Sequence, residues 1–123
     1  MATTTKTINF TATFAIKDAA GTASPNKVIK DTDLTVTQVQ TSDPMTIAAA
    51  TANFSVPFGQ ITVARRIFLS TDQEVTLKIG LVGETGFAWH GAGIIPLGTT
   101  GVPALFITTG GTATNVEVVI AGE

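Results

Sequence analysis

The chain has 123 residues, of which 44% are hydrophobic and only 13% are charged, with a formal net charge of −2 and no cysteine. A chain of this length can build one core without disulfide or metal cross-links. Seven cationic side chains against nine carboxylates exclude a basic nucleic-acid-binding surface. Without cysteine, disulfide frameworks and thiol catalysis are excluded as well. Threonine, alanine and glycine are the commonest residues, and this composition favours strands over helices.

The N-terminal residues are polar and threonine-rich. Residues 1–6 lack the apolar stretch of a secretory signal, and no apolar run in the chain reaches the roughly 18 residues that span a bilayer. We expect residues 1–6 to form a flexible arm, in which Thr3, Thr4 and Thr5 become ordered only against a partner chain. Residues 7–123 are expected to form a single domain.

Alternation of apolar and polar residues with a period of two predicts strands in the first third of the chain. It is clearest over residues 7–16. Residues 17–26 collect charge, glycine, serine and proline, which predicts a loop. A short strand is expected at residues 27–30 and another at residues 33–40, with a bulge where Val39 breaks the alternation.

The central third predicts a hairpin. Residues 41–44 are expected to form a turn. Residues 45–58 are compatible with a helical turn or with a strand, and we favour a strand at residues 53–58. Pro57 then belongs at a sheet edge or at the end of that strand. Residues 60–69 and 74–82 both alternate, and the polar residues 70–73 between them predict a turn that makes the two segments a hairpin.

The last third is rich in glycine. Residues 83–101 contain six glycines, which predicts short strands separated by tight bends. Strands at residues 102–108 and 115–121, joined by a Thr-Gly-Gly-Thr turn, predict a second hairpin. About eight short strands and no helix predict an all-β chain, a single-domain, jelly-roll-like β-sandwich.

The chain offers few residues for chemistry. It has one histidine and no cysteine or tyrosine, its serines lie outside the Gly-x-Ser-x-Gly pattern, and its glycine pairs lack the context of a phosphate-binding loop. His90 follows Trp89 in a glycine-flanked segment, where a histidine is more often exposed or at an interface than catalytic. No metal-ligand spacing is present. We therefore expect no enzymatic activity, no cofactor and no metal ion.

The low charge instead indicates a surface that another chain covers. Soluble monomers of this size usually carry roughly 25% charged residues. We expect Phe87, Trp89 and His90 to form a contact surface, because two large rings in a glycine-bounded stretch must be buried somewhere. Arg65 and Arg66 are consecutive in a predicted strand, so their side chains point to opposite faces. One of them is therefore a candidate for a buried ion pair or an ion pair between subunits; the alternative is that both arginines are exposed.

Three segments resemble small virion structural proteins of tailed bacteriophages. They are RIFLSTDQEVTLKI (residues 66–79), GVPALFIT (residues 101–108) and TATNVEVVIAG (residues 112–122). The resemblance covers roughly residues 60–123. It implies a virion protein made in the host cytoplasm, whose partners are its own copies and other virion subunits, and not nucleic acid or membrane.

Of the possible functions, we expect a capsid decoration (cement) protein that forms homotrimers on the lattice of the major capsid protein. The alternative is a tail or neck subunit, acting as a ring or adaptor of the virion. A carbohydrate-binding β-sandwich that stacks Trp89 and Phe87 on a sugar is a weaker alternative, because the chain has one tryptophan and no tyrosine.

Overall fold

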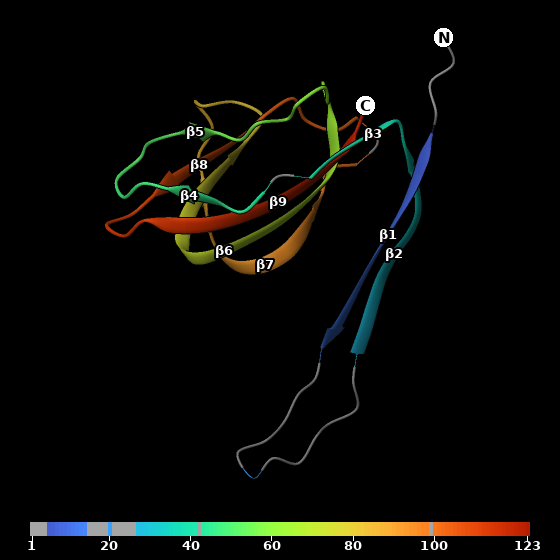
Figure 1. Ribbon diagram of the computed structural model, residues 1–123, viewed down its shortest axis with the longest axis horizontal. Helices are drawn as coiled ribbons and strands as arrows, with labels where there is room; N and C mark the ends of the chain where they lie inside the picture. The colour runs from blue at the N-terminus through green and yellow to red at the C-terminus, as the bar shows by residue number, and fades with distance from the viewer. Residues whose placement is uncertain (1–4, 15–19, 21–26, 42, 99) are drawn as a thin grey trace. The chain divides into compact units, whose positions relative to one another are not determined.

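The computed structural model describes residues 5–14, 20, 27–41, 43–98 and 100–123. Within these residues the chain contains nine antiparallel strands and no helix, as Figure 1 shows. The structure therefore confirms the predicted all-β, sandwich-like fold. It divides into two compact units, residues 1–36 and residues 37–123. Lys6, expected to be the last residue of the flexible arm, is the first residue of a strand, and residues 1–4 of that arm lie outside the described residues.

The first unit contains β1 (Lys6–Phe14) and β2 (Lys27–Val36), which pair antiparallel with a register shift between Ile8 and Phe10. The strands expected at residues 27–30 and 33–40 are wrong in their bounds, because β2 is continuous and the chain bends at Thr37. The predicted bulge at Val39 is also wrong, since Val39 pairs in register with Ala121. Of the predicted loop, only residue 20 lies within the described residues.

The second unit is one curled, seven-stranded sheet in the order β3-β9-β6-β8-β5, with β4 on β9 and β7 on β6. Its strands are β3 (Gln38–Thr41), β4 (Met45–Ile47), β5 (Phe54–Ser55), β6 (Ala64–Ile79), β7 (Phe87–Pro96), β8 (Leu105–Thr109) and β9 (Thr114–Gly122). The 16-residue β6 organises the sheet. Along one side it pairs with β9 and then with β8, and along the other with β7.

The predicted hairpin across residues 70–73 is wrong, because β6 continues through this segment. The register shifts between Thr71 and Val75, which leaves three exposed residues, Asp72, Gln73 and Glu74, at a bend. Thr71 and Val75 are both buried, so the inward face of the strand keeps its phase across the bend. A bend of this kind increases the local twist and lets one sheet fold over its own core.

The second predicted hairpin is also wrong, although both of its strands exist. β8 and β9 do not pair with each other; β8 pairs with the second half of β6 and β9 with the first half. The turn at residues 110–113 therefore carries the chain from one half of the curled sheet to the other. The segment at residues 83–101, expected to hold short strands, contains the ten-residue β7.

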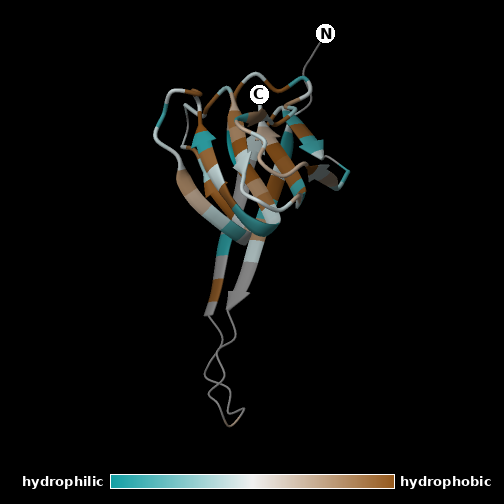
Figure 2. Cartoon of the chain, turned by 90° about the vertical axis from the view of Figure 1, so that its left-hand side faces the viewer, coloured by the Kyte–Doolittle hydropathy of each residue, from teal (hydrophilic) through white to brown (hydrophobic). Residues whose placement is uncertain are grey.

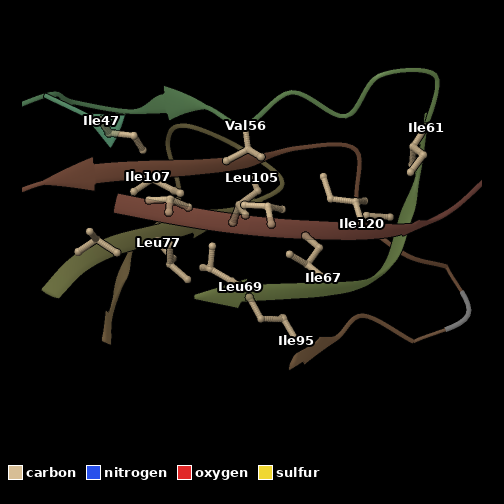
Figure 3. Close-up of a cluster of buried hydrophobic side chains, with 14 residues drawn as sticks. Ile47, Val56, Ile61, Ile67, Leu69, Leu77, Ile95, Leu105, Ile107 and Ile120 are labelled. Atoms are coloured by element: carbon tan, nitrogen blue, oxygen red, sulfur yellow. The ribbon is translucent and has the colours of Figure 1, made fainter. Parts of the chain in front are cut away.

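The core lies inside this curl. Figure 3 shows Ile67, Leu69 and Leu77 of β6 gathered with Leu105 and Ile107 of β8 in one buried cluster. These five side chains have no solvent exposure. Apolar and polar residues alternate along the strands, as the colours of Figure 2 show, because successive side chains of a strand point to opposite faces.

Candidate protein interface

Three exposed apolar residues lie where β6 connects to β7. Leu81 is 64% exposed, Val82 is 45% exposed and Phe87 is 43% exposed. Only one other large apolar residue among those described is comparably exposed, Val28 in the first unit. We call Leu81, Val82 and Phe87 the β6–β7 tip. Exposed apolar surface is a feature of protein–protein contact sites, so these residues are the candidate interface of the chain.

Three hydrogen bonds to backbone carbonyl oxygens hold the tip in place. Gly80, whose φ of 94° favours glycine, donates its N–H to the carbonyl oxygen of Ala104 at 2.9 Å. Glu84 N–H donates to the Leu81 carbonyl at 3.2 Å, and Lys78 Nζ donates to the Val82 carbonyl at 3.0 Å. The apolar side chains are therefore presented on an anchored turn, which lowers the entropic cost of ordering them against a partner.

Trp89 lies differently from Phe87, although both are in β7. Its ring is partly buried and packs against the core cluster, and its Nε1–H donates to the carbonyl oxygen of Gly91 at 3.0 Å. A Cβ at Gly93 would lie 3.0 Å from Cη2 of this ring. Gly93 therefore leaves the space that the indole occupies. Of the two rings predicted to share a contact surface, the structure packs Trp89 on the core and exposes Phe87.

His90 is exposed, and strand alternation places it on the face of β7 opposite to Trp89. Among the described residues, no group of three His, Asp or Glu side chains is placed to hold a metal ion. His90 is therefore an exposed polar residue on the outer face of β7.

Arg65 and Arg66 are both half-buried at the start of β6. Arg65 Nη1 lies 3.6 Å from Glu123 Oε1, an ion pair in which the Glu123 side chain is 59% exposed. Arg66 Nη1 donates to the Arg65 carbonyl oxygen at 2.9 Å. Both arginines thus have partners within their own chain, at a distance along β6 from the tip.

The threonines of the predicted N-terminal contact lie mostly outside the described residues. Thr3 and Thr4 are not described, and Thr5 is exposed and immediately precedes β1.

Sequence reasoning missed Leu81 and Val82, which it placed at the end of a strand. The signal was present, because Gly80 and Gly83 flank the pair and glycine on both sides of two aliphatic residues is typical of a turn. Alternation alone is misleading here, since Leu81 continues the phase of Leu77 and Ile79 after β6 has ended.

Comparison of the chain with protein-family models, with curated proteins and with solved structures finds no match. In the part of the chain that the structure describes, no helix is long and apolar enough to cross a membrane.

Proposed function

We propose that this protein is a non-enzymatic structural component of a tailed-bacteriophage virion: a capsid decoration protein that forms homotrimers and binds the lattice of the major capsid protein. The observation that carries the proposal is the β6–β7 tip, where Leu81, Val82 and Phe87 remain 43–64% exposed on an anchored turn. The resemblance of residues 60–123 to small virion proteins supplies the context.

The proposed mechanism is cross-linking by multivalent contact. Each tip buries apolar area on a capsid subunit, and apolar burial contributes about 25 cal/mol per Å². A single tip is a small contact, but an oligomer presents several tips on one rigid body, so the second and third contacts form at high effective concentration. A ligand that binds only the assembled lattice stabilises that lattice against opening.

The composition supports binding to a protein over binding to nucleic acid or a sugar. The net charge of −2 provides no attraction for phosphate. Sugar-binding sites stack exposed aromatic rings, and here the indole of Trp89 lies against the core, which leaves Phe87 as the exposed ring of the pair. A contact through aliphatic side chains such as Leu81 and Val82 requires an apolar protein surface opposite.

The copy number of the protein in purified virus particles tests the proposal. A decoration protein occurs on the order of hundreds of copies per particle, because it follows the symmetry of the capsid lattice, whereas a tail or neck ring holds about six to twelve. Quantitative mass spectrometry against the major capsid protein measures this number. A ring-like copy number would favour the tail or neck alternative, and absence of the protein from particles would overturn the virion assignment.

A further inference from the structure

Strand β7 has one edge that pairs with no other described strand. Its neighbour in the seven-stranded sheet is β6 alone, and β7 has ten residues, whereas β3, β4 and β5 at the other edges have two to four. Edges of natural sheets are usually short, or blocked by charged side chains, proline or bulges. β7 contains no aspartate, glutamate, lysine or arginine, and its proline is the last residue, Pro96. We call this side of β7 the free edge.

Two hydrogen bonds identify the residues that face the free edge. Just after β7, Leu97 N–H donates to the carbonyl oxygen of Arg65 at 3.0 Å, so an odd-numbered residue faces β6. Just after β6, Gly80 N–H donates to Ala104 in front of β8, so the odd-numbered residues of β6 face β7 and their odd-numbered partners. Because successive residues direct their backbone groups to opposite edges, the even-numbered residues of β7 face the free edge. Besides Pro96 they are Ala88, His90, Ala92 and Ile94.

The free edge offers the hydrogen-bonding groups of a regular strand. Pro96 lacks its N–H on the side away from β6, the one place in a sheet where proline interrupts no ladder bond. The other four even-numbered residues each present an N–H and a carbonyl oxygen, repeated about every 6.8 Å. The backbone of another extended segment matches a row of donors and acceptors with this spacing.

Phe87 shows that the core-facing side of the sheet is incomplete beside the free edge. It pairs in register with Leu77, whose side chain has no solvent exposure, so the two side chains share a face. Leu77 has a described strand on each side, whereas Phe87 has one on a single side and is 43% exposed. A strand added about 4.8 Å from β7 would cover this ring. The free edge and the β6–β7 tip are therefore continuous, because Phe87 belongs to both.

From these relationships we propose that the free edge of β7 binds an extended segment of a partner protein, which joins the sheet as a further strand. The segment is uncharged, with apolar side chains on the face of Phe87 and small or polar side chains on the face of His90. Its backbone supplies the affinity, and its alternate side chains supply the specificity. The partner is the protein that the β6–β7 tip contacts, and this identification rests on the proposed function.

A synthetic peptide tests the free edge with the purified full-length chain alone. The probe is a capped peptide of about eight alternating valines and threonines, with a lysine at each end for solubility. Its control carries Pro-Pro at the centre, which removes an N–H from both edges of the peptide. At a probe concentration about ten times the Kd, the amides of Ala92 and Ile94 should exchange about tenfold more slowly, with those of Gly93 and Ile95 unchanged. Equal binding of the control, or no slowing at Ala92 and Ile94, would overturn the proposal.

Substitution of Ala92 tests the same edge from the protein side. Ala92→Pro removes an N–H that faces away from β6, and Ala92→Thr keeps this N–H as the matched control. Ala92→Pro should bind the probe at least about tenfold more weakly than Ala92→Thr, which should bind as the native chain does. The fluorescence of Trp89 and the denaturation midpoint show whether each variant is folded. If Ala92→Pro does not fold, the amide-exchange experiment on the native chain decides.

Binding to virus particles from which the protein has been removed separates this inference from the proposed function. Ala92→Pro should bind the particles at least about tenfold more weakly than Ala92→Thr. Native binding by a folded Ala92→Pro would overturn the strand pairing and leave the proposed function intact. Particles that do not bind even the native chain would overturn the proposed function, and the peptide titration then decides whether the edge accepts a strand. Protection of the Ala92 and Ile94 amides that rises with protein concentration without peptide would assign the edge to a second copy and overturn the proposal.

Discussion

The carboxylate of Asp72 accepts two hydrogen bonds from Asn115: one from the backbone N–H to Oδ1 and one from Nδ2 to Oδ2, each 2.8 Å long. Asp72 lies at the bend of β6, and Asn115 is the second residue of β9. Asn115 Oδ1 in turn accepts the Oγ1–H of Thr46 at 2.8 Å, in β4. One exposed carboxylate thus connects the bend of the central strand to two neighbouring strands.

Replacing Asp72 with alanine should destabilise the fold by about 1–2 kcal/mol, because it removes two hydrogen bonds to a charged group at a solvent-exposed site. Urea denaturation of the purified chain measures the loss. Asp43→Ala is the matched control, since Asp43 is also an exposed aspartate and has no hydrogen-bond partner among the described residues. Equal stability of the two variants would show that the Asp72–Asn115 pair does not support the bend.

Gly93→Ala should destabilise the fold by about 1–3 kcal/mol through overpacking. Its new Cβ would lie 3.0 Å from Cη2 and 3.2 Å from Cζ2 of Trp89, so the indole has to shift. Trp89 is the only tryptophan, and its fluorescence emission should move to longer wavelength as the ring gains contact with water. Gly110→Ala, at a glycine with open space around it, should change neither the denaturation midpoint nor the spectrum.

Trp89→Ala should lower the free energy of unfolding of the isolated chain by about 2–4 kcal/mol, because the ring packs on the core. Phe87→Ala should have a much smaller effect on stability, because Phe87 is 43% exposed. Thermal melts of the two variants make the comparison. An unchanged melting temperature for Trp89→Ala, together with lost assembly, would instead assign the indole to an interface.

Leu81→Glu should leave the stability of the chain within about 0.5 kcal/mol of the native value, because the side chain is 64% exposed. It should abolish binding to virus particles, since a carboxylate cannot be buried on an apolar surface without a partner. Thr85→Glu introduces the same charge at an exposed position in the same loop and should bind normally. Native binding by Leu81→Glu would exclude the tip as the contact.

Much of the strand pattern was predictable from local alternation. β1 was expected at residues 7–16 and lies at Lys6–Phe14, and the last strand was expected at residues 115–121 and lies at Thr114–Gly122. Both strands bury one face and expose the other, so their sequences carry the period of two. Along β7 the residues alternate between exposed and half-buried over most of the strand, but alanine and glycine occupy several of these positions, so the sequence lacks a clear apolar–polar alternation and the length of the strand was underestimated.

Strand pairing was not predictable in the same way. The polar residues 70–73 have the composition of a turn, yet the chain passes through them as a bend because β7 remains paired to both halves of β6. The Thr-Gly-Gly-Thr segment does reverse the chain, yet the strands on either side pair with different halves of β6. Local composition reports that the chain deviates from a regular strand, but it does not report which strand lies alongside.

The sequence by itself determined the class of the fold, the small number of groups available for chemistry and the low content of charged residues, because these depend on composition and on the period of the apolar residues. Only the tertiary structure decided which rings are exposed and why particular glycines are required. Gly122 is an example, since a Cβ there would overlap the carbonyl oxygen of Val63, a residue distant in the chain. Such requirements arise from contacts between segments far apart in sequence, so they cannot be predicted from the pattern of neighbouring residues.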